Sequence, residues 1–170
     1  MLKELISNWN KFCKEENFIG IGFTRKVYRL SDYAIKVHLH PIGKFQSIRE
    51  SEVCNEMGKR NLNYLFAETF YVGESISIQK YYVPLELRNN QSYDITVEED
   101  VHFIPNRYEE VLSILDKEFD CFDLKDSSNY GLSNEGKLVF IDYGMNKNLY
   151  ETEWVPLAES GKLPQIFFDY

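Results

Sequence analysis

The chain has 170 residues, 44% of them hydrophobic, so it is long enough for one domain, or two small parts sharing a cleft, around a real core. Its net charge of −8 would repel a phosphate backbone, so we expect no nucleic-acid partner. We also expect a cytoplasmic protein without a membrane partner, because no stretch reaches the roughly 18 apolar residues of a membrane span and the 3 cysteines form no CxxC pair.

The first half of the chain alternates between helical and strand patterns. Leu2, Leu5, Ile6, Trp9 and Phe12 recur at helical spacing and predict an amphipathic helix ending near Lys14. Strands are then expected at 18–19, 26–30 and 33–39, followed by a helix from Ser47 to about Gly58 and by strands at 66–72 and 75–80. This order predicts an α+β fold whose five strands form an antiparallel sheet.

The second half begins with a change of character at Pro84, so we divide the chain into 1–83 and 84–170. Asn106 is expected to cap a helix that runs to about Phe119. A polar loop at 123–129, a hairpin turning at 133–136 and an apolar strand at 138–141 follow. The remainder, 154–168, is expected to cover the lower core as one helix or an extended tail.

Gly20 and Gly22 lie at the turn between the first two predicted strands. Without side chains there, backbone N–H groups can approach phosphates closely. The alternative is a tight hairpin whose glycines are needed for positive φ.

Lys36 lies inside an otherwise apolar strand, where a buried ammonium is costly unless a carboxylate neutralises it. Glu50 is the expected partner, because Val53, Cys54 and Met57 follow it at helical spacing and place it on the inward face. The alternative is that Glu50 only closes a capping box with Ser47.

Asp142 follows a predicted buried strand and precedes Gly144, a position suited to holding a hard cation such as magnesium, or to forming a simple turn. In the polar loop upstream, Asp123 could orient an attacking hydroxyl and Asn129 could offer an amide oxygen to a metal. His38 and His40 have only loose metal-ligand spacing, and we interpret them as surface or packing residues.

Five segments, in order, resemble the motifs of the protein-kinase-like superfamily between about 18 and 145. They are Ile19–Tyr28 for the glycine-rich loop, Ala34-Ile35-Lys36 for the lysine strand, Glu50 for the αC glutamate, Asp123–Asn129 for the catalytic loop and Asp142-Tyr143-Gly144 for the magnesium motif. The chain is most similar to a minimal, atypical bacterial or phage-type member.

The resemblance implies a bilobal fold: a five-stranded antiparallel N-lobe sheet with an αC helix, and a reduced C-lobe. It implies ATP and Mg²⁺ as cofactors, with Lys36 on the phosphates, Glu50 orienting Lys36, Asp142 and Asn129 on magnesium, and Asp123 positioning the acceptor. The remaining nucleotide-binding positions that it implies are Gly20, Gly22, Val27, Ala34, Gln79 and Tyr81.

The chain departs from the family pattern at several places. Arg25 replaces the third glycine, Cys121-Phe122 replaces the His-Arg pair, and Asn129 lies one position late, which leaves Asp126 as a competing base. Few residues follow Gly144. Two functions therefore stay open: a phosphotransferase, or a catalytically inactive, kinase-shaped protein that docks on or inhibits a protein partner. A weaker third is an acidic mimic of nucleic acid.

Overall fold

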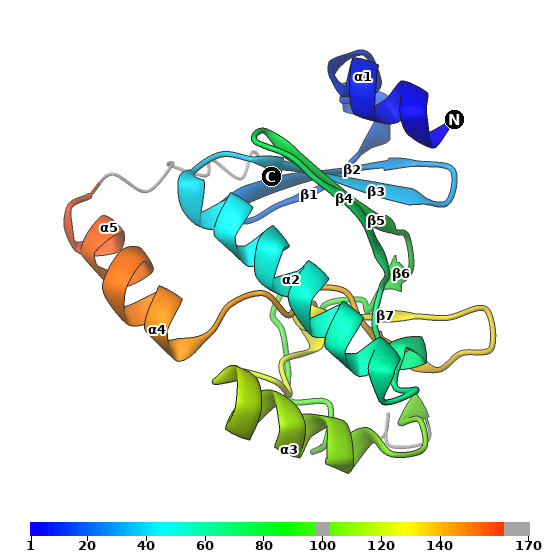
Figure 1. The fold of residues 1–170 in the computed structure, drawn as a ribbon, viewed down its shortest axis with the longest axis vertical. Coiled ribbons are helices and arrows are strands. Elements are labelled where there is room, and N and C mark those ends of the chain that lie inside the picture. Colours follow the sequence, from blue (N-terminus) through cyan, green and yellow to red (C-terminus); the bar gives the residue numbers. More distant parts are fainter. Residues whose placement is uncertain (98–102, 162–170) are drawn as a thin grey trace.

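The computed structural model describes residues 1–97 and 103–161, and it has an α+β fold built around a five-stranded antiparallel sheet (Figure 1). The strand order is β1-β2-β3-β5-β4. The strands are β1 (Phe18–Ile21), β2 (Arg25–Leu30), β3 (Tyr33–His38), β4 (Thr69–Val72) and β5 (Ile76–Lys80). The predicted sheet is confirmed, and each strand lies within three residues of its expected bounds.

The two faces of this sheet carry different side chains because alternate residues of a strand point to opposite sides. Ile35 and Ile78 pack against α1 (Leu2–Phe12) through Leu5, which is fully buried. Lys36 and Gln79 point to the other face. Figure 1 shows α1 on one side of the sheet and α2 (Pro41–Lys59) on the other. The polar face of the sheet is thus enclosed by α2.

The helix α2 begins six residues earlier than the sequence predicted. Pro41 occupies its first turn, where a missing N–H costs nothing, and the His40 ring accepts a hydrogen bond from the Ile42 N–H at 3.3 Å. Ser47 therefore lies inside the helix and bonds back to the Gly43 carbonyl at 3.0 Å. The predicted capping box of Ser47 and Glu50 is wrong, since neither residue is at the helix start.

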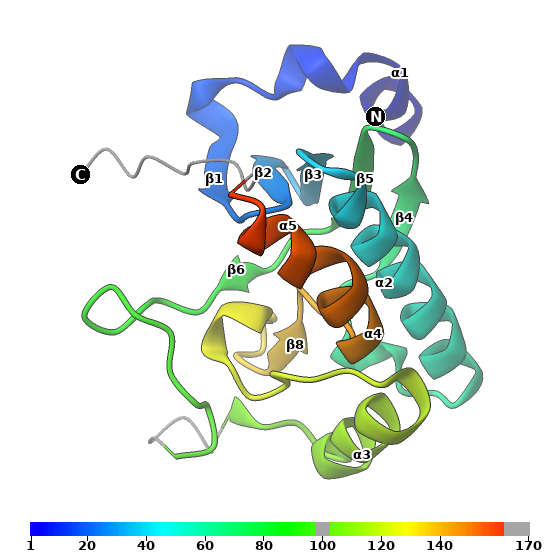
Figure 2. The same ribbon diagram turned by 90° about the vertical axis from the view of Figure 1, so that its left-hand side faces the viewer.

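The rest of the described chain forms a small sheet flanked by helices (Figure 2). Its strands are β6 (Val83–Pro84), β7 (Tyr130–Leu132) and β8 (Leu138–Phe140), and its main helix is α3 (Tyr108–Phe119). The predicted hairpin at 133–136 joins β7 to β8. Asn106 is not the cap of α3, because the residue at that position is Arg107, in a left-handed conformation without a side-chain capping bond.

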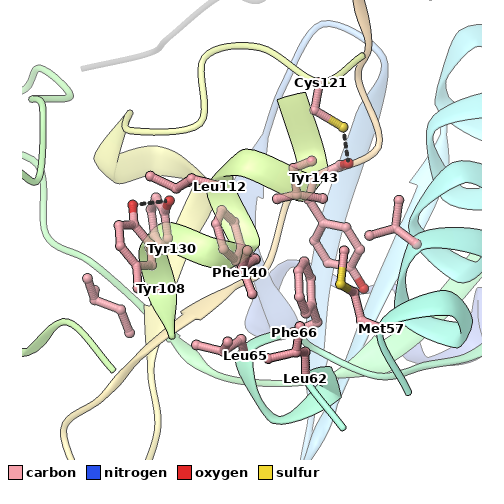
Figure 3. Close-up of a cluster of buried hydrophobic side chains, with 14 of the residues drawn as sticks. Met57, Leu62, Leu65, Phe66, Tyr108, Leu112, Cys121, Tyr130, Phe140 and Tyr143 are labelled. Carbon is pink, nitrogen blue, oxygen red and sulfur yellow. Dashed lines mark hydrogen bonds between the residues drawn. The ribbon is translucent and has the colours of Figure 1, made fainter. Parts of the chain in front are cut away.

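A second core lies between α2, α3 and the small sheet. Phe66 stacks on Phe140 with ring centroids 5.1 Å apart, and the Tyr143 ring meets Phe66 edge-on at 4.9 Å (Figure 3). The Tyr143 hydroxyl donates to the Ala67 carbonyl at 2.7 Å. The chain just before and after Tyr143 is consequently fixed relative to both sheets.

Short helical segments complete the described chain: η1 (Glu15–Asn17), η2 (Asn63–Leu65), η4 (Ser127–Asn129), α4 (Lys147–Leu149), η5 (Tyr150–Trp154) and α5 (Val155–Glu159). The helical alternative for the end of the chain is confirmed up to Glu159, but η5 and α5 bury no residue, and Trp154 meets Phe23 of the glycine turn instead of the lower core. The expected continuation at 162–168 lies outside the described residues. Among the helices described, none is long and apolar enough to cross a membrane.

Candidate functional site

A cavity of about 170 Å³ lies between the five-stranded sheet and the segment after β8. We call it the lysine cavity, and it is lined by Ile19, Gly20, Val27, Ala34, Lys36, Gln79, Lys80, Tyr81, Tyr82, Pro84, Ser128, Ile141 and Asp142. Six of the predicted nucleotide-binding residues thus share one cavity with Asp142. Gly22 and Glu50 do not line it.

The glycine turn between β1 and β2 forms without left-handed backbone at its two glycines. The hairpin of the alternative does form between β1 and β2. Neither Gly20 nor Gly22 has positive φ, so the conformational reason given for these glycines is wrong. A Cβ atom built on Gly20 would meet nothing within 4 Å. The Gly22 N–H donates to the Arg25 carbonyl at 2.8 Å and is therefore not free for a ligand. Gly20 is itself one of the residues that line the lysine cavity.

Lys36 meets Glu50 as the helical pattern predicted. Its Nζ atom donates to both Glu50 carboxylate oxygens at 3.0 Å and to the Ile141 carbonyl at 2.7 Å. Both side chains are buried, with 6% and 1% of their surface exposed. A buried ammonium so paired satisfies its charge and its three donors inside the protein.

Arg25 is the residue that the sequence analysis missed as part of the site. Its guanidinium is buried and contacts the Glu50 carboxylate at 2.9 Å and the Asp142 carboxylate at 2.5 Å. A third bond reaches the Ser47 hydroxyl at 3.3 Å. The position of a missing third glycine was the only signal in the sequence, and it gave no direction for the side chain.

Arg25, Lys36, Glu50 and Asp142 together form what we call the charge cluster, with two cations and two anions. Burial and the Arg25 guanidinium lower the pKa of Lys36, although Glu50 and Asp142 oppose this shift. The partial desolvation of Asp142 would raise its pKa, but Arg25 and Lys36 outweigh this effect and hold the pKa below its ordinary value. Asp142 is thus ionised at neutral pH, and the cluster is balanced.

A second cavity of about 130 Å³ adjoins the first at Asp142. We call it the loop cavity, and it is lined by Gln46, Phe122, Asp123, Leu124, Asn129, Phe140, Asp142, Tyr143 and Met145. The Asn129 amide nitrogen donates to the Asp123 carbonyl at 2.8 Å, and the Asn129 carbonyl accepts from the Ile141 N–H at 2.8 Å. These bonds place Asp123, Asn129 and Asp142 in one cavity despite the extra residue in the loop.

Asp126, the competing base, has another task. Its carboxylate accepts hydrogen bonds from the Ser128 N–H at 2.8 Å and from the Ser92 hydroxyl at 2.7 Å, so it caps the turn η4. It lines neither cavity. Burial and the charge of Asp126 raise the pKa of Asp123, the direction expected for a carboxylate that is to accept a proton.

Asp142 and Asn129 both line the loop cavity and carry oxygen atoms of the kind that could hold a hard cation such as magnesium. The Asp142 side chain is 45% exposed, so one oxygen can face the cavity while the other accepts from Arg25. The Asn129 amide oxygen is not used in the bond to Asp123. Within 1–97 and 103–161 no group of three or more His, Cys, Asp or Glu side chains forms a metal site by itself, so phosphates and water would have to supply the other ligands.

Two backbone N–H groups at the end of β5 already donate hydrogen bonds within the protein. The Lys80 N–H donates to the Glu68 carbonyl and the Tyr81 N–H donates to the Asp32 carbonyl, both at 2.8 Å. Gln79 is 1% exposed and donates its amide to the Ala67 carbonyl. An adenine ring in the lysine cavity would therefore meet backbone carbonyl groups at the end of β5, or the backbone of Tyr82. It could not bond to the N–H groups of Lys80 and Tyr81.

A row of aromatic rings connects the glycine turn to the polar loop. Phe23 meets Trp154 edge-on at 5.9 Å, Trp154 stacks on Tyr150 at 5.0 Å, and Tyr150 meets Phe122 edge-on at 5.0 Å. Phe122 directly precedes Asp123. The segment η5 thus ties the tip of the turn to the loop cavity.

The two histidines have structural contacts. His40 caps α2, and His38 bonds to the Glu74 carbonyl and the Ser47 hydroxyl, each at 3.0 Å. Their interpretation as packing residues agrees with these contacts.

No family model matches this chain, and a search of curated proteins finds no significant relative.

Proposed function

We propose that the protein binds ATP with magnesium in the lysine cavity and transfers the γ-phosphoryl group to a hydroxyl acceptor, as its resemblance to the protein-kinase-like superfamily implies. The observation that carries the proposal is convergence. Motifs spread from Gly20 to Asp142 line two cavities that share Asp142, and the polar loop contributes Asp123 and Asn129 to the second of them.

Each group has a role that its chemistry supports. The apolar walls Val27 and Ala34 would hold the base, and Lys36, oriented by Glu50, would meet the phosphates. Asp142 and Asn129 would hold the magnesium ion, which neutralises the charge that develops on the phosphoryl oxygens. Asp123, which lines the loop cavity and an open groove beside it, would position the acceptor hydroxyl.

Nucleotide binding is tested by thermal unfolding in a titration with Mg·ATP. A ligand at 100 times its dissociation constant stabilises the native state by about 2.7 kcal/mol, which raises Tm measurably. The Lys36→Met variant should lose this rise. Lys59→Met, at an exposed position of α2, is the matched control and should keep it. A flat titration of the folded wild type would refute the binding proposal.

Transfer is tested separately with labelled ATP and a panel of hydroxyl acceptors. Asp123→Asn should bind nucleotide and fail to transfer, whereas Asp126→Asn should transfer, because Asp126 caps a turn. Transfer that survives Asp123→Asn would contradict the role given to this residue.

A second candidate function, an inactive docking protein, is favoured by one observation. The three bonds of Lys36 to Glu50 and Ile141 use all the donors of an ammonium group, so a phosphate must displace one of them. A folded protein that shows no nucleotide-dependent rise in Tm would support this candidate. A rise without any transfer would leave binding intact and refute the enzyme.

A further inference from the structure

The inference concerns Arg25 and rests on the proposed nucleotide site. Arg25 lies on β2, next to the glycine turn, and its guanidinium is 4% exposed. One terminal nitrogen contacts Glu50 and the other contacts Asp142. A planar guanidinium presents its donors as a fixed fork, so it bridges two carboxylates with defined geometry.

The position of this cation determines the electrostatics at Asp142. A carboxylate that lines a phosphate site repels a polyphosphate unless a cation lies between or beside them. A divalent metal usually supplies that charge. Here the guanidinium is already bonded to one Asp142 oxygen, and an arginine side chain stays protonated at any pH at which the fold exists.

The sum of the charges in the charge cluster also depends on Arg25. With Arg25 present, the charge cluster is neutral before any metal arrives, since Lys36 offsets Glu50 and Arg25 offsets Asp142. Without Arg25 the cluster would carry one net negative charge beside the lysine cavity. Arg25 does not line that cavity, so it would act through Asp142 and not by touching the phosphates.

We propose that Arg25 is a positioning residue that serves as a built-in counter-ion for Asp142, so that nucleotide binding at this site depends only weakly on a divalent metal. Transfer of the phosphoryl group still uses the metal held by Asp142 and Asn129. In this protein, therefore, phosphoryl transfer would require the metal, whereas ATP binding would require it only weakly.

The test measures the dissociation constant of ATP by thermal titration, in magnesium and in EDTA, for the wild type and Arg25→Gln. The ratio of the EDTA value to the magnesium value should be below about 10 in the wild type and at least tenfold larger in Arg25→Gln. Arg25→Lys, which keeps the charge, should stay closer to the wild type. Lys26→Gln, the neighbouring residue on β2, is the matched control: its ammonium lies over the Phe18 and Tyr28 rings.

A double variant, Arg25→Gln with Asp142→Asn, provides a stricter check because it removes the unshielded carboxylate together with its counter-ion. Its ratio should return toward the wild-type value. If Arg25→Gln does not fold, the wild-type ratio still decides, since a ratio above about 10 would overturn the inference by itself.

The outcomes distinguish the two proposals. Binding that strictly requires magnesium in the wild type, or an unchanged ratio in Arg25→Gln, would refute the role of Arg25 and leave the nucleotide site standing. Absence of ATP binding in both buffers would refute the nucleotide site itself, and the inference with it.

Discussion

Replacing Glu50 by glutamine tests whether the charge cluster holds the two halves of the site together. Glu50 is 1% exposed, and its carboxylate faces the buried cations of both Lys36 and Arg25. Glutamine keeps the shape and removes the charge, so the cluster would carry one net positive charge in a buried setting. Removing one partner of a buried ion pair costs about 3–5 kcal/mol.

For a chain of this length, each kcal/mol lowers Tm by about 2–4 °C, so we expect a fall of about 6–20 °C. The assay is thermal unfolding followed by circular dichroism without added ligand. Glu52→Gln is the matched control on the same helix, because the side chain of Glu52 is 53% exposed and its pairing with Arg49 is solvated. It should leave Tm nearly unchanged.

A double variant separates charge from packing. Adding Lys36→Met to Glu50→Gln restores charge balance between Arg25 and Asp142, so the two losses should not add, with a coupling of about 0.5–3 kcal/mol. Equal, small effects of Glu50→Gln and Glu52→Gln would refute the reasoning, as would strict additivity in the double variant. Either result would mean that the cluster is solvated or that its ions do not interact.

Three further predictions concern other parts of the site. In protein without metal, the pKa of the Asp142 carboxyl in the folded state lies below its ordinary 3.8, so the ionised form stabilises the fold above pH 3.8. The stability advantage of the wild type over Asp142→Asn, measured by urea unfolding, should be lost as the pH falls through the folded-state pKa. Gly144→Ala would place a Cβ atom 2.1 Å from a carbonyl oxygen of α2 and should lower the free energy of unfolding by at least about 1–3 kcal/mol. Gly58→Ala lies at a helical position with nothing within 4 Å and should raise the free energy of unfolding by about 0.5–1 kcal/mol. Similar urea curves for the two variants would contradict this. Phe23→Ala removes the contact with Trp154 and should weaken ATP binding about 2- to 10-fold in the thermal titration, and unchanged affinity would show that this contact does not hold the turn over the cavity.

The sequence by itself determined the elements and part of the pairing. Apolar and β-branched runs separated by turn signals predicted five antiparallel strands, and the structure has them. Helical spacing placed Glu50 on the inward side of α2, and that was sufficient to pair it with Lys36. These predictions succeeded since each depends on neighbours within a few residues, which local geometry controls.

The start of α2 and the cap of α3 were predicted wrongly because capping residues alone do not fix where a helix begins. Ser47 and Asn106 are good capping residues, but α2 already begins at Pro41 and α3 begins after Arg107. Capping contributes only about 1 kcal/mol, so packing of the whole helix decides where it begins.

Only the tertiary structure decided the direction of Arg25 and the place of the polar loop. Arg25 and Asp142 are 117 positions apart, and the bond between them exists because β2, α2 and the segment after β8 meet at one point. The bonds of Asn129 to Asp123 and Ile141 likewise settle which side chains share a cavity. No local pattern encodes such contacts, because they depend on how distant elements pack and on which charges remain to be neutralised once water is excluded.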